Sequence, residues 1–249
     1  AHFGHQARRW NPKMAPYLYG TQEGVHVFDL VKTKSALEEA LEAISLAVAE
    51  GKVILLLGSK KQAREKIIEI GTETAMPYVS ERWLGGTLTN FEMIKRSLTK
   101  LSEMKTKMAA GEYNKFTKKE RLLLEREIAR LERFFGGMSS LEKTPDVLFI
   151  VDTHKEAGAV KEAKKSKVTV IGIVDSNADP TLVDYPIPMN DDAAKAVEYV
   201  LGLVKEAIVE GKKKVKKELF AFKEVKQGIE VTTWVDRETA RINGMKLPN

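Results

Sequence analysis

The chain has 249 residues, a formal net charge of +6 and no cysteine, and 43% of its residues are hydrophobic. These values are typical of a globular protein, and they exclude disulfide frameworks, cysteine nucleophiles, iron–sulfur clusters and cysteine zinc sites. No apolar run approaches the roughly 18 residues that a membrane-spanning helix needs. The first ten residues, AHFGHQARRW, lack the apolar core of a signal peptide. The composition is therefore compatible with a reducing cytoplasm.

Basic residues are concentrated in three segments. Residues 1–20 carry a net charge of +3, residues 95–143 carry +6 and residues 205–217 carry +4, so the rest of the chain sums to −7. Basic segments on a neutral-to-acidic body predict a polyanionic partner, and nucleic acid is favoured over a membrane. The alternative interpretation is that these segments are solvated, lysine-rich helix faces.

The first quarter of the chain predicts a strand, a helix and a second strand. A short strand is expected at 25–28. Ser35 and Glu38 have the spacing of a capping box, which predicts the start of a helix that continues to about Val48. The run VILLL at 53–57 shows no polar alternation and is typical of a buried parallel strand.

Strand, turn and helix then repeat along the chain. A helical pattern follows Gly58, and a short strand is expected at 77–79. Buried strands are expected at 147–151 and 168–174, with a second helical pattern between them after His154. This repetition predicts an α/β body in which helices cover both faces of a parallel sheet.

Residues 90–135 interrupt this rhythm. Thr117 and Glu120 form a second capping-box pattern, and Gly136 and Gly137 mark the return to the body. Apolar residues recur here at spacings of three and four, as in the seam of a coiled coil: Ile94, Leu98, Leu101, Leu124, Ile128, Leu131 and Phe135. Two arms of about 20 residues would project about 30 Å. Such a basic arm suits the gripping of a large partner better than it suits a metabolic enzyme.

The last third adds a strand, a helix and a tail. Prolines flank the strand at 77–79 and a further strand at 185–189, which favours edge or entry positions in the sheet. A final helix is expected from about Asp192 toward Gly211. We divide the chain into three parts: an α/β domain of residues 1–90 and 138–215, an inserted hairpin of residues 91–137, and a C-terminal extension of residues 216–249.

The turn after the first buried strand, Gly58-Ser59-Lys60-Lys61, opens a helix whose amides could hold a phosphate. It lacks the spacing of a P-loop and of the three-glycine dinucleotide fingerprint. We therefore expect Lys60 and Lys61 to contact an RNA backbone phosphate rather than a free nucleotide.

A catalytic site is the competing interpretation. Four polar side chains lie at or after expected strand ends: Asp152, His154, Asp175 and Asp179. Doubly wound enzymes place catalytic groups at such positions, so an acid–base pair stays an alternative. Aspartate is also common in turns and helix caps, and no Gly-x-Ser-x-Gly elbow is present. His2 and His5 would need several acidic ligands to hold a metal, and we expect no metal or cofactor.

Two segments combine basic side chains with tryptophan, at 8–13 and at 82–90. Lysine and arginine bind phosphates, whereas a tryptophan ring either stacks on a base or covers apolar surface. We expect RNA to be bound by these segments, the turn at 60–61 and the start of the hairpin. The candidate residues are Arg8, Arg9, Trp10, Lys13, Lys60, Lys61, Arg82, Trp83, Lys95 and Arg96.

Long strings in the chain also match a known family. They are AHFGHQARRWNPKM, YLYG, GVHVFDL, LLGSKKQA, RWLGGTLTNF and DSNADPTLVDYPIPMNDDA. In this order, and over about residues 1–210, the chain resembles small-subunit ribosomal protein two of bacteria and organelles. The tail from about Lys216, which includes Trp234, matches no part of the family pattern.

The resemblance implies a three-layer α/β/α body, flavodoxin-like or Rossmann-like, with an inserted coiled-coil hairpin and without catalysis or a bound nucleotide. It implies a structural protein of the cytoplasmic small ribosomal subunit, or of an organelle ribosome. Such a protein binds small-subunit ribosomal RNA at the junction of head and body. It also helps to dock ribosomal protein one, which loads messenger RNA. The alternatives are a Rossmann-like enzyme or small-ligand binder, and an adaptor whose coiled-coil arm recruits a protein without RNA.

Overall fold

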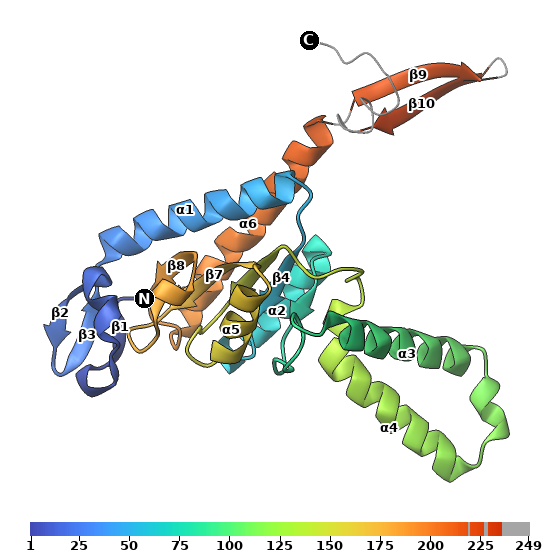
Figure 1. The fold of residues 1–249 in the computed structure, drawn as a ribbon, viewed down its shortest axis with the longest axis horizontal. Coiled ribbons are helices and arrows are strands. Elements are labelled where there is room, and N and C mark those ends of the chain that lie inside the picture. Colours follow the sequence, from blue (N-terminus) through green and yellow to red (C-terminus); the bar gives the residue numbers. More distant parts are fainter. Residues whose placement is uncertain (219, 227–228, 236–249) are drawn as a thin grey trace.

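A five-stranded parallel sheet forms the centre of the computed structural model (Figure 1), which describes residues 1–218, 220–226 and 229–235, with side chains through Lys214. The strand order is β5-β4-β6-β7-β8 and every pair is parallel. The strands are β4 (Ile54–Leu57), β5 (Tyr78–Val79), β6 (Val147–Ile150), β7 (Thr169–Val174) and β8 (Tyr185–Pro188). The expected strands are confirmed, and β5 and β8 lie at the two edges, one of the two placements that their flanking prolines favoured.

Helices cover both faces of the sheet, which confirms the three-layer α/β/α class. The bounds are α1 (Leu30–Ala49), α2 (Lys61–Thr74), α5 (Ala157–Lys165) and α6 (Ala194–Glu218). Alternate residues of β4 point to opposite faces: Ile54 and Leu56 pack with α1, α2 and α6, whereas Leu55 and Leu57 pack with α5 and the N-terminal segment. All four are at most 1% exposed. An uninterrupted apolar run is therefore required here, because both faces of the strand are buried.

A small antiparallel sheet precedes α1. Its order is β1-β3-β2, with bounds β1 (Phe3–Gln6), β2 (Leu18–Gln22) and β3 (Val25–Phe28). Short 3-10 helices lie at Ala7–Arg9 and Pro12–Tyr17. Glu23 and Gly24 join β2 to β3 with φ of 50° and 78°, as a two-residue hairpin turn requires. Only β3 was expected; β1 and β2 are short and mostly exposed, so they carry no apolar signal.

The expected start of α1 and the expected end of α6 were both wrong. The Asp29 side chain accepts hydrogen bonds from the N–H groups of Val31 (3.0 Å) and Lys32 (3.4 Å), so α1 starts before Ser35. Helix α6 runs on past Gly211, whose added Cβ would lie 2.6 Å from the Ser45 carbonyl oxygen. This glycine permits the close approach of α1 and α6 and does not end the helix.

Two helices project from the body between β5 and β6 (Figure 1). They are α3 (Phe91–Ala109) and α4 (Lys118–Phe135), joined through a 3-10 turn at Glu112–Lys115 and followed by another at Gly136–Met138. The capping box at the start of α4 is confirmed, because Thr117 and Glu120 exchange both hydrogen bonds. The apolar seam is buried at Leu101, which is 3% exposed, and only partly buried at Leu124, nearer the tip. Supercoiling of the pair, and its status as a separate domain, stay predictions.

The tail contains structure that the sequence analysis did not expect. Strands β9 (Phe220–Lys226) and β10 (Ile229–Val235) form an antiparallel pair in which Trp234 lies opposite Ala221. The rest of the extension, residues 236–249, lies outside the described residues. Among the helices that the structure describes, none is long and apolar enough to cross a membrane.

Candidate nucleic-acid interface

The carboxyl ends of the parallel strands bring the candidate segments to one edge of the sheet, here called the carboxyl edge. The turn at 58–61 follows β4, and the loop at 80–90 follows β5. The N-terminal segment crosses the ends of β7 and β8. The N–H of Asn11 donates to the carbonyl oxygen of Ser176 (2.7 Å), and the N–H of Asn190 donates to that of Ala1 (3.0 Å). Ligands of open α/β sheets bind at this edge.

Lys60 is enclosed by carboxylates at this edge. Its Nζ lies 2.6 Å from oxygens of Asp191 and Asp192 and 3.4 Å from Asp152 Oδ2, and its side chain is 14% exposed. Although burial opposes the charged form, hydrogen bonds to Asp191 and Asp192 raise the pKa of Lys60. The expectation that Lys60 contacts a phosphate is therefore not supported, because its charge is already compensated within the protein.

The same network ties the N-terminal strand to the sheet. Burial raises the pKa of Asp191 to about 7, the charges of Asp152 and Asp175 act in the same direction, and Lys60 opposes them. Fully buried Asp175 accepts a hydrogen bond from the N–H of Asp191 (3.1 Å), and its Oδ1 lies 3.1 Å from Nδ1 of His5 on β1. These contacts make the cluster part of the structural framework.

Of the side chains of the catalytic alternative, Asp152 and Asp175 belong to the cluster around Lys60, whereas Asp179 and His154 lie outside it. Asp152 has a φ of 69° and accepts a hydrogen bond from the N–H of Lys155 (2.8 Å). Asp179 accepts from Lys13 Nζ (2.6 Å), whereas His154 is exposed on the turn after β6. This geometry does not assemble an acid–base pair. Within the described residues, no group of three or more potential ligands is placed to hold a metal ion.

A cleft of about 530 Å³ lies between the loop at 80–90 and the start of α5. Arg64, Arg82 and Lys155 are the cations on its wall. Arg64 pairs with Glu81 at 3.2 Å, whereas Arg82 and Lys155 form no ion pair with a described side chain. The cleft also exposes the backbone at Gly85 and Gly158, where an added Cβ would meet nothing within 4 Å. A phosphate could therefore reach both the cations and the backbone amides.

The two candidate tryptophans differ in their surroundings. Trp83 is 8% exposed, and its Nε1 donates to Glu162 Oε1 at 3.2 Å, so it is a core residue and no stacking platform. Trp10 is half-buried, and its ring lies 4.8 Å from the ring of His26. Because His26 lies against one face of the Trp10 ring, a base could stack only on the other face.

Glu162 on α5 organises the loop that contains Trp83. Its carboxylate accepts hydrogen bonds from the N–H groups of Gly86 (2.8 Å), Leu88 (3.2 Å) and Thr89 (3.4 Å). Burial opposes the charged form, but these bonds lower the pKa of Glu162. Sequence alone does not reveal this role of Glu162, because its partners lie more than 70 positions away. The one local indication is that Glu162 lies on α5 between Ala159 and Ala163, two residues of the buried face of that helix.

The remaining candidates are exposed basic side chains. Lys13 is exposed but is held by Asp179, as described above. The others form no ion pair with any residue that the structure describes: Arg8, Arg9, Lys61, Arg82, Lys95 and Arg96. These six cations are the part of the predicted set that is available to an external anion.

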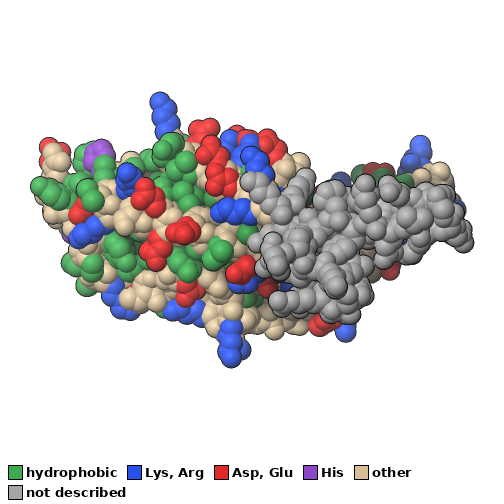
Figure 2. All heavy atoms as spheres, turned by 90° about the horizontal axis from the view of Figure 1, so that it is seen from above, with side chains coloured by type: hydrophobic (Ala, Val, Ile, Leu, Met, Phe, Trp, Pro, Cys, Tyr) green, Lys and Arg blue, Asp and Glu red, His purple; other side chains and the backbone are tan. Residues whose placement is uncertain are grey.

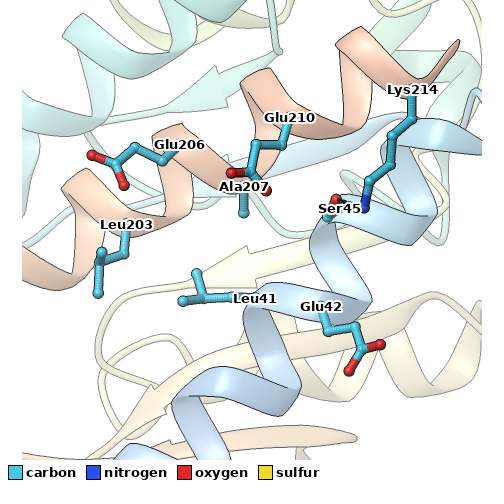
Figure 3. Close-up of a pocket in the computed structure, with 8 residues that line it drawn as sticks. All are labelled: Leu41, Glu42, Ser45, Leu203, Glu206, Ala207, Glu210 and Lys214. Atoms are coloured by element: carbon cyan, nitrogen blue, oxygen red, sulfur yellow. Dashed lines mark hydrogen bonds between the residues drawn. The ribbon is translucent and has the colours of Figure 1, made fainter. Parts of the chain in front are cut away.

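A groove between α1 and α6 has the opposite character (Figure 3). It measures about 290 Å³, and its wall combines the apolar Leu41 and Leu203 with three carboxylates and one cation: Glu42, Glu206, Glu210 and Lys214. Figure 2 shows acidic, basic and hydrophobic side chains interspersed over this face. This groove has three carboxylates and one cation on its wall, whereas the cleft beside the loop at 80–90 has three of each, so we place no RNA contact in the groove.

Comparison with known proteins agrees with this arrangement. The model of the ribosomal protein S2 family matches residues 1–211. The small ribosomal subunit protein uS2 of a Roseiflexus species is 48% identical over 211 residues, which are 85% of this chain and 80% of that protein. The protein of the same name from Brucella melitensis is 46% identical over 210 residues, 84% of this chain and 82% of the relative. The chain therefore belongs to the ribosomal protein S2 family and is a structural ribosomal protein rather than an enzyme.

Proposed function

We propose that this chain binds small-subunit ribosomal RNA through the carboxyl edge of its sheet and the root of its hairpin. The observation that carries the proposal is the set of six exposed cations without internal ion partners, on segments that the fold gathers around that edge. Each cation that meets a phosphate releases condensed counterions, which provides affinity with little base specificity. The relatives named above, small ribosomal subunit proteins, are consistent with such a partner.

The position of the chain in the small subunit and its protein partner rest on the resemblance of the motifs quoted above to small-subunit ribosomal protein two. In this proposal the chain lies at the junction of head and body of the cytoplasmic small subunit and helps to dock ribosomal protein one. A rigid α/β body with a projecting helix pair suits that position, because it can contact two parts of a large particle (Figure 1).

Salt dependence tests the RNA proposal. Six phosphate contacts predict that the binding constant falls about 10³-fold between 50 and 200 mM salt. The measurement is a filter-binding titration of the full chain with bacterial small-subunit ribosomal RNA at four salt concentrations. Binding that is insensitive to salt would contradict the proposal, and so would equal affinity for an uncharged peptide nucleic acid of matching sequence.

A further inference from the structure

The loop at 82–90 has few hydrogen bonds of its own. Within it, the N–H of Thr87 donates to the carbonyl oxygen of Leu84 (3.2 Å), and the N–H of Asn90 donates to that of Gly86 (2.8 Å). Gly86 has a φ of 92°, a conformation that side-chain-bearing residues rarely adopt. The conformation of this loop is thus set by contacts from outside it.

The side-chain hydrogen bonds that reach the loop from outside, among the described residues, come from one carboxylate. Both oxygens of Glu162 are engaged: Oε1 accepts from the N–H of Gly86 and from Trp83 Nε1, and Oε2 accepts from the N–H groups of Leu88 and Thr89 and from Thr89 Oγ1 at 3.3 Å. Hydrogen bonds to an ionised acceptor are shorter and stronger than neutral ones. A single side chain therefore holds four residues of the loop: Trp83, Gly86, Leu88 and Thr89.

The loop is anchored to rigid parts of the body on both sides. Glu162 lies on α5 between Ala159 and Ala163, both fully buried against the sheet. At the far end of the loop, Leu88 is 3% exposed and Phe91, the first residue of α3, is 9% exposed. The orientation of Arg82 and the root of the hairpin are thus both connected to the body through this cluster.

We propose that Glu162 is a positioning residue of the RNA interface, which holds the loop at 82–90 so that Arg82 and the start of α3 meet RNA phosphates in a fixed geometry. This inference rests on the proposed function. It assigns to an acidic residue, which itself repels RNA, a favourable contribution to RNA binding. A pre-ordered loop loses less conformational entropy when it binds, and this compensates for the repulsion.

The charge of Glu162 makes the test directional. Glu162→Gln removes one negative charge, so simple electrostatics predicts tighter RNA binding. Loss of positioning predicts weaker binding, because the Gln amide presents N–H donors where the loop also presents donors. Glu39→Gln on α1 is the matched control: Glu39 is exposed and has no ion pair with a described residue.

The experiment compares wild type, Glu162→Gln and Glu39→Gln as full-length chains. RNA affinity is measured with bacterial small-subunit ribosomal RNA at several salt concentrations, and amide hydrogen exchange is followed at Leu88 and Thr89. We expect Glu162→Gln to bind about tenfold more weakly with an unchanged salt slope, because no phosphate contact is removed, and to lose protection at both amides. Glu39→Gln should bind like wild type or slightly more tightly.

The outcomes distinguish failure of this inference alone from failure of the proposed function. If wild type binds and Glu162→Gln binds as well or better while its loop amides exchange fast, the positioning role is overturned and the proposed function stands. If wild type does not bind RNA, both fall. Should Glu162→Gln fail to fold, Trp83→Phe removes only one donor to the carboxylate. It should then weaken binding two- to threefold, and undiminished binding would overturn the inference.

Discussion

Two neighbouring regions at the carboxyl edge use the same residue types for different purposes. Around Lys60, one cation contacts three carboxylates of the same chain, of which Asp152 and Asp191 are buried and Asp192 is 55% exposed. In the cleft beside the loop at 80–90, the acidic Glu162 faces backbone amides, and Arg82 keeps its charge exposed toward solvent. The first region holds the N-terminal segment and the strand ends together. The second presents charge to a partner.

This difference shows that a count of basic residues does not measure the charge available for binding. Lys60 and Lys61 are adjacent in the sequence, yet the first is 14% exposed and ion-paired, and the second is exposed at the first position of α2. Buried ion pairs serve stability or specificity and attract no distant polyanion. Exposed cations contribute little to stability, but they can release counterions from RNA.

The largest expected effect comes from replacing Lys60. Lys60→Met leaves the carboxylates of Asp152, Asp191 and Asp192 without their cation, and removal of one partner of a buried ion pair costs about 3–5 kcal/mol. Urea unfolding at pH 7 should show that loss in the free energy of unfolding. Lys61→Met is the control, with a change within about 0.5 kcal/mol. Equal stability of the two variants would remove the distinction between the regions.

A smaller effect is expected in the cleft, and it appears in binding rather than in stability. The double variant Arg82→Ala, Lys155→Ala should reduce the slope of the salt dependence of RNA binding by about 1.5, because each phosphate contact contributes roughly 0.7 to 0.9. Titration of the same RNA at several salt concentrations measures that slope. Glu206→Gln, Glu210→Gln in the groove between α1 and α6 is the comparison variant, and its slope should match wild type. A groove variant with the larger change would relocate the interface.

Much of the fold could be predicted because its signals are local. The uninterrupted apolar strands, the seam of α3 and α4 and the capping box at Thr117 each lie within a short window of sequence. The strands β1 and β2 could not be predicted, because they are held by pairing with β3 and carry little buried apolar surface. The start of α1 was placed too late because Ser35 satisfies the capping pattern while Asp29 makes the actual cap.

The candidate site was harder to predict, because its chemistry depends on contacts between distant residues. Exposed cations such as Lys61 and Arg82 follow from residue type alone. The neutralisation of Lys60 requires Asp191, 131 positions away, and the hydrogen bond that buries Trp83 requires Glu162, 79 positions away. No local pattern encodes either partnership. For this reason only the folded structure shows that Lys60 and Trp83, two of the predicted RNA-binding residues, make internal contacts.

Titration of Asp191 provides the finest separation of the two regions. Its pKa is raised to about 7 in the folded chain from an ordinary 3.8, mainly by burial. Between about pH 4 and pH 7 the folded state therefore binds more protons at this carboxyl than the unfolded state, so its contribution to the free energy of unfolding falls as pH rises.

Asp191→Asn removes that titration while keeping the shape of the side chain. The difference in unfolding free energy between variant and wild type should move in favour of the variant from pH 4 to pH 7, as measured by urea unfolding at unit pH intervals. The pKa values of Glu162 and Asp179 are lowered in the folded chain, so their contributions to the free energy of unfolding decrease as pH falls, which is the opposite pH dependence. Both are present in each protein, so they cancel in the difference. A difference that is constant with pH would mean that Lys60 keeps Asp191 ionised throughout, and the enclosed region would then be a permanent ion network with no titrating member in this range.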